Sequence, residues 1–205
     1  MTAPFPLDET GLWREVLKPR AGAPRPAIFL DRDGTLIELV AYLSDPEKVR
    51  PIDGALALVS VANARGLPVV LITNQSGIAR GLYDWHAFAA VQARLVALLE
   101  AAGCGLDAVM ACPAGPDSDA PCRKPNPGML IEAARLLPLD LPASWIVGDA
   151  AIDLEAGKRA GLRRFWLAPT GYGQRDVEAA RALIEPGADA TFLEPLSMLA
   201  ARLAR

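Results

Sequence analysis

Residues 27–36 read AIFLDRDGTL, four apolar residues followed by two aspartates that are one residue apart. The apolar run is typical of a short buried strand. Alternate side chains of a strand point to the same face, so Asp31 and Asp33 start on one side. Gly34 allows a sharp turn directly after them. Two carboxylates this close repel each other unless a cation or a proton lies between them. The alternative is a turn capped by an aspartate, which follows many strands.

A second and a third apolar run also end in polar residues. Residues 67–77 read LPVVLITNQSG, so this run ends in a hydroxyl and two amides, those of Thr73, Asn74 and Gln75. Residues 145–149 read WIVGD, so that run ends at Asp149. In an open parallel sheet, ligands bind outside the carboxyl ends of the strands. The sequence therefore predicts that these side chains meet the two aspartates of the first run at one site.

Two basic residues and a further acid precede or begin helical segments. Residues 122–129 read CRKPNPGM, with Arg123 and Lys124 ahead of a proline-started helix. Asp153 lies four residues after Asp149. It is either an acid of the site or a residue favoured in the first helical turn by the helix dipole.

Strand and helix patterns alternate along the chain, which predicts an α/β fold with a doubly wound parallel sheet. The expected strands are 27–31, 68–73, 107–111, 144–148 and 163–167, and the expected helices are 54–65, 84–102, 127–136 and 151–160. A last helix–strand–helix portion covers 177–203, and residues 1–25 form an arm on the surface.

Composition agrees with one globular enzyme. The chain has 205 residues, of which 52% are hydrophobic and 22% charged, and its net charge is −3. No basic stripe points to a nucleic acid, and no apolar run reaches the ~20 residues needed to span a bilayer. The beginning of the sequence lacks the basic-then-apolar order of a signal peptide. We expect a cytoplasmic monomer without nucleic-acid or membrane partners, in which the three cysteines form no disulfide framework.

The order of these motifs closely resembles the haloacid dehalogenase superfamily of phosphohydrolases. That superfamily is marked by Asp-x-Asp-x-Thr, then a Ser or Thr, then a Lys or Arg, and then Gly-Asp with a further acid. The matching residues are Asp31, Asp33, Thr73, Lys124 and Asp149, and the resemblance extends from Ala27 to about Gly173. It implies a Rossmann-like core and phosphoester hydrolysis.

The resemblance also implies a role for each matching residue. Asp31, Asp149 and the backbone carbonyl of Asp33 would hold Mg²⁺, a hard cation that prefers oxygen ligands. Asp31 would be the nucleophile that forms an aspartyl-phosphate. Asp33 would protonate the leaving oxygen and later activate water.

Other polar residues would bind the phosphoryl group or orient the site. Thr73 and Asn74 would hydrogen-bond the transferring phosphoryl group, and Lys124 would balance its charge. Asp153 would orient the site without contacting the metal ion.

Spacing leaves no room for an inserted cap domain. The segment 36–71 has to hold a loop and one helix, and the segment 77–123 holds one helix, one short strand and a Pro-rich loop. We therefore expect a single capless phosphatase domain over residues 1–205, with an open site bordered by loops.

A narrower resemblance concerns residues 73–81, TNQSGIARG, and residues 122–129. Both are similar to the D-glycero-D-manno-heptose 1,7-bisphosphate phosphatases, in which the enzyme removes the 7-phosphate. In that branch the arginine at the position of Arg123 helps bind the substrate, a small phosphorylated sugar. Two alternatives stay open: a phosphatase for another phosphometabolite such as histidinol phosphate, and a non-catalytic protein that binds phosphorylated ligands.

The loop after the fourth expected strand departs from that branch. Members of that branch usually carry a zinc-bound loop with Cys-x-His and Cys-x-Cys. Here Ala114 and Ala120 replace the His and one Cys, so that only Cys112 and Cys122 remain. A structural zinc site needs four ligands, and therefore structural zinc is not expected. The lone histidine, His86, has no metal-like spacing and is expected on a helix surface.

Overall fold

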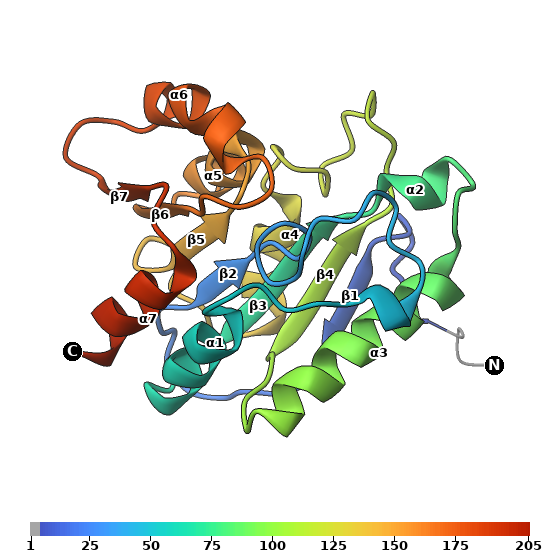
Figure 1. The fold of residues 1–205 in the computed structure, drawn as a ribbon, viewed down its shortest axis with the longest axis horizontal. Coiled ribbons are helices and arrows are strands. Elements are labelled where there is room, and N and C mark those ends of the chain that lie inside the picture. The colour runs from blue at the N-terminus through green and yellow to red at the C-terminus, as the bar shows by residue number, and fades with distance from the viewer. Residues whose placement is uncertain (1–4) are drawn as a thin grey trace.

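Seven strands form one sheet in the order β1-β4-β3-β2-β5-β6-β7, as the computed structural model of residues 5–205 shows (Figure 1). The strands are β1 (Trp13–Val16), β2 (Ile28–Leu30), β3 (Val69–Asn74), β4 (Ala108–Cys112), β5 (Trp145–Gly148), β6 (Arg164–Leu167) and β7 (Asp189–Phe192). All neighbours are parallel except β1, which is antiparallel to β4.

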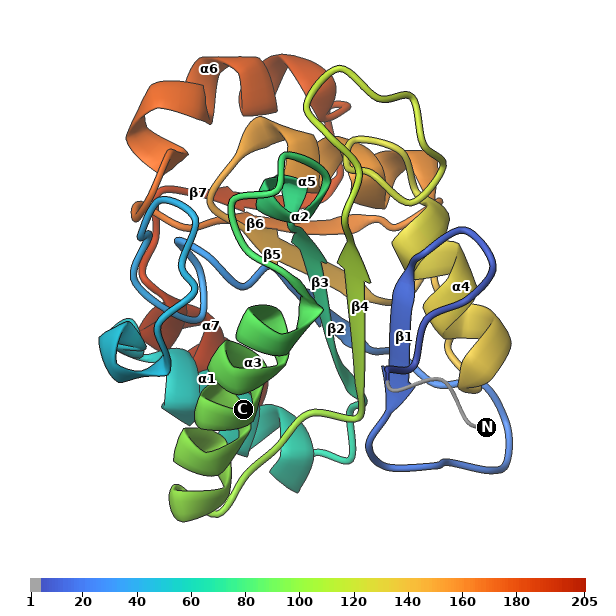
Figure 2. The same ribbon diagram turned by 90° about the vertical axis from the view of Figure 1, so that its right-hand side faces the viewer.

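Helices cover both faces of the sheet. They are a 3-10 helix η1 (Pro46–Lys48), α1 (Ala55–Ala64), α2 (Ser76–Ala79), α3 (Trp85–Ala101), α4 (Gly128–Leu136), α5 (Ala151–Arg159), α6 (Gly173–Leu183) and α7 (Leu196–Ala204). One core cluster joins α1, α3 and α7 to the sheet, and a second joins α4, α5 and α6 to its other face. Figure 2 shows α3 and α4 on opposite sides of the sheet.

The predicted doubly wound α/β fold is thus confirmed. The strands from β2 to β6 and the helices α1, α3, α4 and α5 begin and end within one residue of the predicted bounds. The strands β2 to β6 are continuous apolar runs because a sheet covered on both faces buries both sets of alternating side chains. Of the two segments in which a cap would be inserted, 36–71 holds η1, α1 and the start of β3, and 77–123 holds the rest of α2, α3 and β4.

The N-terminal arm differs from the prediction. It contributes β1, whose Trp13 pairs in register with Ala111 of β4. Trp13 is buried, and its ring lies 5.4 Å from that of Trp85 and 5.1 Å from that of Phe88, both on α3. The arm is therefore part of the sheet, where Figure 2 shows β1 beside β4, and the buried Trp13 ring makes it part of the core as well.

Register brings the carboxyl ends of three strands to one level. Ile28 at the start of β2 pairs with Val69 of β3 and with Trp145 of β5. The residues that follow these strands therefore share one edge of the sheet, as the sequence predicted. Within residues 5–205, no helix combines the length and the apolar character needed to cross a membrane.

Candidate active site

Three buried carboxylates meet at this edge. Asp31 follows β2, Asp149 follows β5, and Asp153 lies in the first turn of α5. One carboxylate oxygen from each lies within 4.8 Å of the other two. All three side chains are almost excluded from solvent. The structure thus brings together three of the acids that the sequence singled out.

Two glycines allow backbone to approach Asp149. A Cβ atom on Gly34 or on Gly171 would overlap a carboxylate oxygen of Asp149. The loop after β6 closes on the same residue, since the backbone N–H of Tyr172 donates to Oδ2 of Asp149 at 2.8 Å. Thr170 fastens this loop by donating from its hydroxyl to the carbonyl of Gly34 at 2.6 Å. Asp149 is therefore held from both sides by backbone.

Lys124 inserts a cation among the acids. Its Nζ lies 2.5 Å from Oδ1 of Asp31 and 2.7 Å from Oδ1 of Asp153. It also donates to the carbonyl of Ile72 at 3.2 Å. The other oxygen of Asp153 accepts the backbone N–H of Ala150 at 3.0 Å, at the start of α5. Asp153 therefore combines both roles considered from the sequence, since it begins a helix and also binds Lys124.

Electrostatics show that the acids outweigh the bases. Burial raises the pKa of Asp31 well above its usual value, and the nearby acids add to this shift while Lys124 opposes it. Burial and the charge of Asp153 raise the pKa of Asp149 to about 7, although the N–H of Tyr172 favours its ionised form. Burial alone would lower the pKa of Lys124, but Asp153 and Asp31 raise it above its usual value. The ammonium group therefore stays charged.

The charge balance of the site fits a divalent cation. Four carboxylates, those of Asp31, Asp33, Asp149 and Asp153, face the two cations of Arg32 and Lys124. Two formal negative charges are left without a partner in a buried place, and such charges need compensation. Their oxygens are hard ligands of the kind that Mg²⁺ takes.

Asp33 lies beside this cluster and points to other partners. Its Oδ2 accepts from Nε2 of Gln75 at 2.9 Å, and the hydroxyl of Thr73 lies 3.4 Å from the same oxygen. Arg32 forms an ion pair with it at 3.0 Å. From the sequence, Gln75 was expected near the site as an amide at the end of a strand, but neither it nor Arg32 was assigned a role. The available signal was an arginine between two aspartates at the end of a buried strand.

Asn74 contacts the chain near Lys124 through both of its amide atoms. Oδ1 accepts the backbone N–H of Lys124 at 3.1 Å, and Nδ2 donates to the carbonyl of the same residue at 3.1 Å. The side chain therefore holds the basic segment against the end of β3. Arg123 is half-buried, and its guanidinium donates to the carbonyl of Ala114 at 3.0 Å.

The loop after β4 corrects one expectation. Cys112 and Cys122 form a disulfide, with their Cα atoms 5.6 Å apart, whereas the sequence predicted no disulfide framework. Cys104 is free and buried. The two paired cysteines lie close because the chain returns past the end of β4 before entering α4. The expectation of no structural zinc still rests on the number of cysteine and histidine ligands in this loop.

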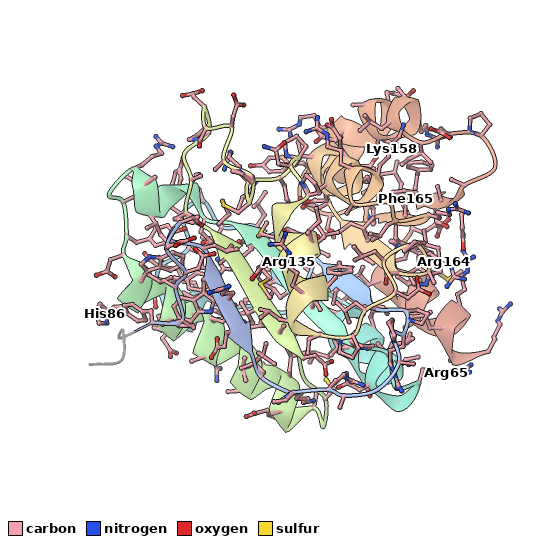
Figure 3. The ribbon with its side chains drawn as sticks, turned by 180° about the vertical axis from the view of Figure 1, so that it is seen from behind. Arg65, His86, Arg135, Lys158, Arg164 and Phe165 are labelled. Atoms are coloured by element: carbon pink, nitrogen blue, oxygen red, sulfur yellow. A yellow bond between two sulfur atoms is a disulfide. The ribbon has the colours of Figure 1, made fainter. Side chains whose placement is uncertain are left out.

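His86 is exposed on α3, as the sequence predicted, and Figure 3 shows it at the edge of the molecule. Its ring contacts that of Phe5 edge to face at 4.7 Å.

Comparison with known proteins places the chain among phosphatases. A family model described as HAD-hydrolase-like matches residues 121–190. The chain is 47% identical over 192 residues to the D-glycero-β-D-manno-heptose-1,7-bisphosphate 7-phosphatase of Mesorhizobium japonicum, covering 90% of this chain and 84% of that protein. The enzyme of the same name from Pseudomonas putida is 40% identical over 74% of this chain and 86% of its own length.

Solved structures agree with these similarities. A HAD-like phosphatase from Mesorhizobium loti superposes with a TM-score of 0.84 at 43% identity, over 98% of this chain and 97% of that one. A D,D-heptose 1,7-bisphosphate phosphatase from Bordetella bronchiseptica, solved with magnesium and phosphate, has a TM-score of 0.78 at 34% identity, over 87% and 98% of the two chains. The chain therefore belongs to the haloacid dehalogenase-like hydrolases and is a phosphatase of the family that includes these heptose bisphosphate enzymes.

Proposed function

We propose that this protein removes the 7-phosphate of D-glycero-D-manno-heptose 1,7-bisphosphate with the help of Mg²⁺, through an aspartyl-phosphate on Asp31. The observation that carries the proposal is the buried cluster of Asp31, Asp149 and Asp153 around Lys124, which combines a nucleophile, a cation and excess negative charge. The similarity to heptose bisphosphate phosphatases supports the substrate.

Mg²⁺ would be held by Asp31, Asp149 and the backbone carbonyl of Asp33. The acids fit it because two negative charges of the site have no partner. When bound, the ion would neutralise phosphate oxygens that otherwise repel an incoming anion.

Asp31 attacks phosphorus with a carboxylate oxygen, and the bond from phosphorus to the C7 oxygen breaks. Asp33 gives its proton to the departing oxygen, which leaves as the sugar hydroxyl. Asp33, now a carboxylate, takes a proton from water as the water oxygen attacks the phosphorus of the aspartyl-phosphate. This second step releases inorganic phosphate and restores Asp31.

Four residues support these steps. Lys124 stabilises charge that develops on the phosphoryl group, since its ammonium already lies 2.5 Å from Oδ1 of Asp31. Asp153 orients Lys124 through their ion pair. Thr73 would hydrogen-bond the phosphoryl group through its hydroxyl, whereas both side-chain amide atoms of Asn74, expected in the same role, already bind the Lys124 backbone.

Arg123 is the proposed contact for the second phosphate. It neighbours Lys124 in sequence, and its planar fork suits a phosphate group. Binding energy from that remote phosphate would orient the reacting one. We further infer a single capless domain that works as a cytoplasmic monomer.

Phosphate release from four compounds tests the proposal. Heptose 1,7-bisphosphate, heptose 7-phosphate, histidinol phosphate and p-nitrophenyl phosphate are compared with Mg²⁺ and with EDTA. We expect the highest kcat/KM for the heptose bisphosphate, and no turnover in EDTA. A preference for histidinol phosphate would support the second candidate substrate. Absence of turnover with all four compounds would leave a protein that only binds phosphorylated ligands.

A further inference from the structure

The buried guanidinium of Arg32 is hydrogen-bonded to Asp33, and the reaction steps above assign it no role. Arg32 is only 1% exposed. Its Nε donates to Oδ2 of Asp33 at 3.1 Å, and its Nη2 donates to Oδ1 at 3.2 Å. The guanidinium carbon lies 5.2 Å from the centre of the Phe88 ring. Arg32 therefore has one defined orientation, set by a carboxylate on one side and an aromatic ring on another.

Gln75 connects this arginine to the rest of the site. Its Oε1 accepts from Nη2 of Arg32 at 3.1 Å and from the hydroxyl of Tyr83 at 2.5 Å. Burial raises the pKa of Tyr83 to about 12, so this hydroxyl keeps its proton and remains a donor. Because two donors face Oε1, the amide Nε2 has to point the other way. It donates to Oδ2 of Asp33 at 2.9 Å and to the hydroxyl oxygen of Thr73 at 2.7 Å.

The two oxygens of Asp33 consequently have different surroundings. Oδ2 faces Nε of Arg32, Nε2 of Gln75 and the Thr73 hydroxyl. Oδ1 accepts only from Nη2 of Arg32 among residues 5–205. The Asp33 side chain is 20% exposed, whereas Arg32 and Gln75 are nearly excluded from water. Its open side is therefore the side away from the network.

We propose that Arg32, Gln75 and Tyr83 are positioning residues, which hold the carboxyl group of Asp33 so that Oδ1 faces the leaving oxygen of the substrate and later the attacking water. This inference rests on the proposed function, since it assigns an orientation to the group that acts there as acid and base. A general acid has to lie within hydrogen-bond reach of the oxygen that it protonates. A carboxyl group free to rotate would spend only part of its time there.

Two substrates with different leaving groups can distinguish a misplaced Asp33 from a general loss of activity. A sugar alkoxide is a strong base and needs the proton that Asp33 supplies. A p-nitrophenolate is a weak base and leaves without one. Attack of water on the aspartyl-phosphate needs Asp33 with either compound. A variant that misplaces Asp33 should therefore slow both steps with the sugar phosphate, but only the second step with p-nitrophenyl phosphate.

The test compares Gln75→Met with the wild-type enzyme in the presence of Mg²⁺. With heptose 1,7-bisphosphate, kcat should fall about 10- to 100-fold, a part of the 10²–10⁴-fold that acid–base catalysis contributes, while KM changes less than about threefold. With p-nitrophenyl phosphate, the first turnover should stay within about threefold of wild type and be followed by a slow steady state, so that one p-nitrophenolate per site appears as a burst.

Gln92→Met is the matched control. Gln92 is a buried glutamine of α3 at 3% exposure, and neither of its side-chain polar atoms has a hydrogen-bond partner within the described residues. This variant should keep wild-type kinetics with both compounds. Tyr83→Phe provides a second, milder probe that keeps the ring and removes only the donor to Gln75. It should show the same burst, with a smaller fall in kcat.

The proposal would be overturned if Gln75→Met lost the same factor in rate with both compounds and showed no burst. If Gln75→Met does not fold, the same result in Tyr83→Phe would overturn it. Unchanged kinetics in both variants would do the same. Failure of the proposed substrate looks different, because wild type and Gln92→Met would then not release phosphate from the heptose bisphosphate. The burst with p-nitrophenyl phosphate would still report on the network.

Discussion

Replacing Lys124 by methionine should destabilise the metal-free protein strongly. The ammonium group contacts Asp31, Asp153 and the Ile72 carbonyl, and Lys124 is 3% exposed. Methionine fills a similar volume but leaves two buried carboxylates without a cation. Removing one partner of a buried ion pair costs about 3–5 kcal/mol. For a domain of this size, each kcal/mol shifts the melting temperature by about 2–4 °C, so the loss amounts to roughly 6–20 °C.

Thermal unfolding in EDTA near neutral pH measures this effect. Lys158→Met is the matched control, since Lys158 lies at the surface of α5 with a 42% exposed side chain and a 3.6 Å pair with Glu185 (Figure 3). An exposed pair of this kind contributes about 0–1 kcal/mol. The Lys124→Met/Asp31→Asn double variant should recover part of the loss, because neighbouring charges are coupled by about 0.5–3 kcal/mol.

A Lys124→Met protein that melts within a few degrees of the Lys158→Met control would refute the reasoning. The acids of the site would then not depend on the ammonium group for their burial. Addition of Mg²⁺ to Lys124→Met gives an independent check. The ion should raise its melting temperature more than that of wild type, since more negative charge is left to neutralise.

Four further outcomes are expected. Asp31→Asn should lower phosphate release by at least about 10⁴-fold, as loss of a nucleophile does, while its melting temperature stays at or above that of wild type because one of the mutually repelling acids is gone. Near-normal turnover would contradict the mechanism. The pKa of Asp149 lies at about 7 in the metal-free folded protein and near 3.8 in the unfolded chain. Between pH 3.8 and pH 7, the folded protein therefore keeps a proton on Asp149 that the unfolded chain has released. The free energy of unfolding in EDTA should therefore fall as the pH rises through this window, by a few kcal/mol at about 1.4 kcal/mol per pKa unit. Denaturant titrations from pH 4 to pH 8 measure this free energy. A free energy of unfolding that rises with pH would refute the prediction. Arg123→Ala should lower kcat/KM for the heptose bisphosphate at least about tenfold more than for p-nitrophenyl phosphate; equal losses would remove the role in binding the second phosphate. Elemental analysis should find no stoichiometric zinc, since the loop after β4 has only two of the four cysteine and histidine positions of a zinc site, and these two cysteines are paired in a disulfide.

The sheet could be predicted because its central strands carry a local signal. Strands β2 to β6 are short apolar runs, and burial on both faces makes each run nearly continuous. β1 escaped prediction because its four residues have no such run, and only Trp13 is buried among them. Its stability comes from pairing with β4 and from packing on α3, contacts that lie about 70 to 100 residues away in the chain.

Asp31, Asp33 and Asp149 could be predicted for the same reason, since each follows a recognisable strand, and Asp153 comes four residues after Asp149. The network around Asp33 could not. Gln75 lies 42 residues from Asp33 and Tyr83 lies eight residues further, so only the register of β2 and β3 brings them together. The disulfide depends likewise on the path of the loop, which no local pattern of residues determines.

The short connection between Asn74 and the Lys124 backbone bears on how this enzyme can change over time. Lys124 takes its position from the Asn74 side chain at the end of β3, and the cysteine pair fixes the base of the loop that precedes it. Residues 116–119 at the tip of that loop are exposed. Their identity and number can therefore drift without displacing the ammonium group. Under the proposed function, Arg123 binds substrate beside this loop, to which it donates at Ala114. Variation at the tip would then change substrate preference while the groups that act on the phosphoryl group stay in place.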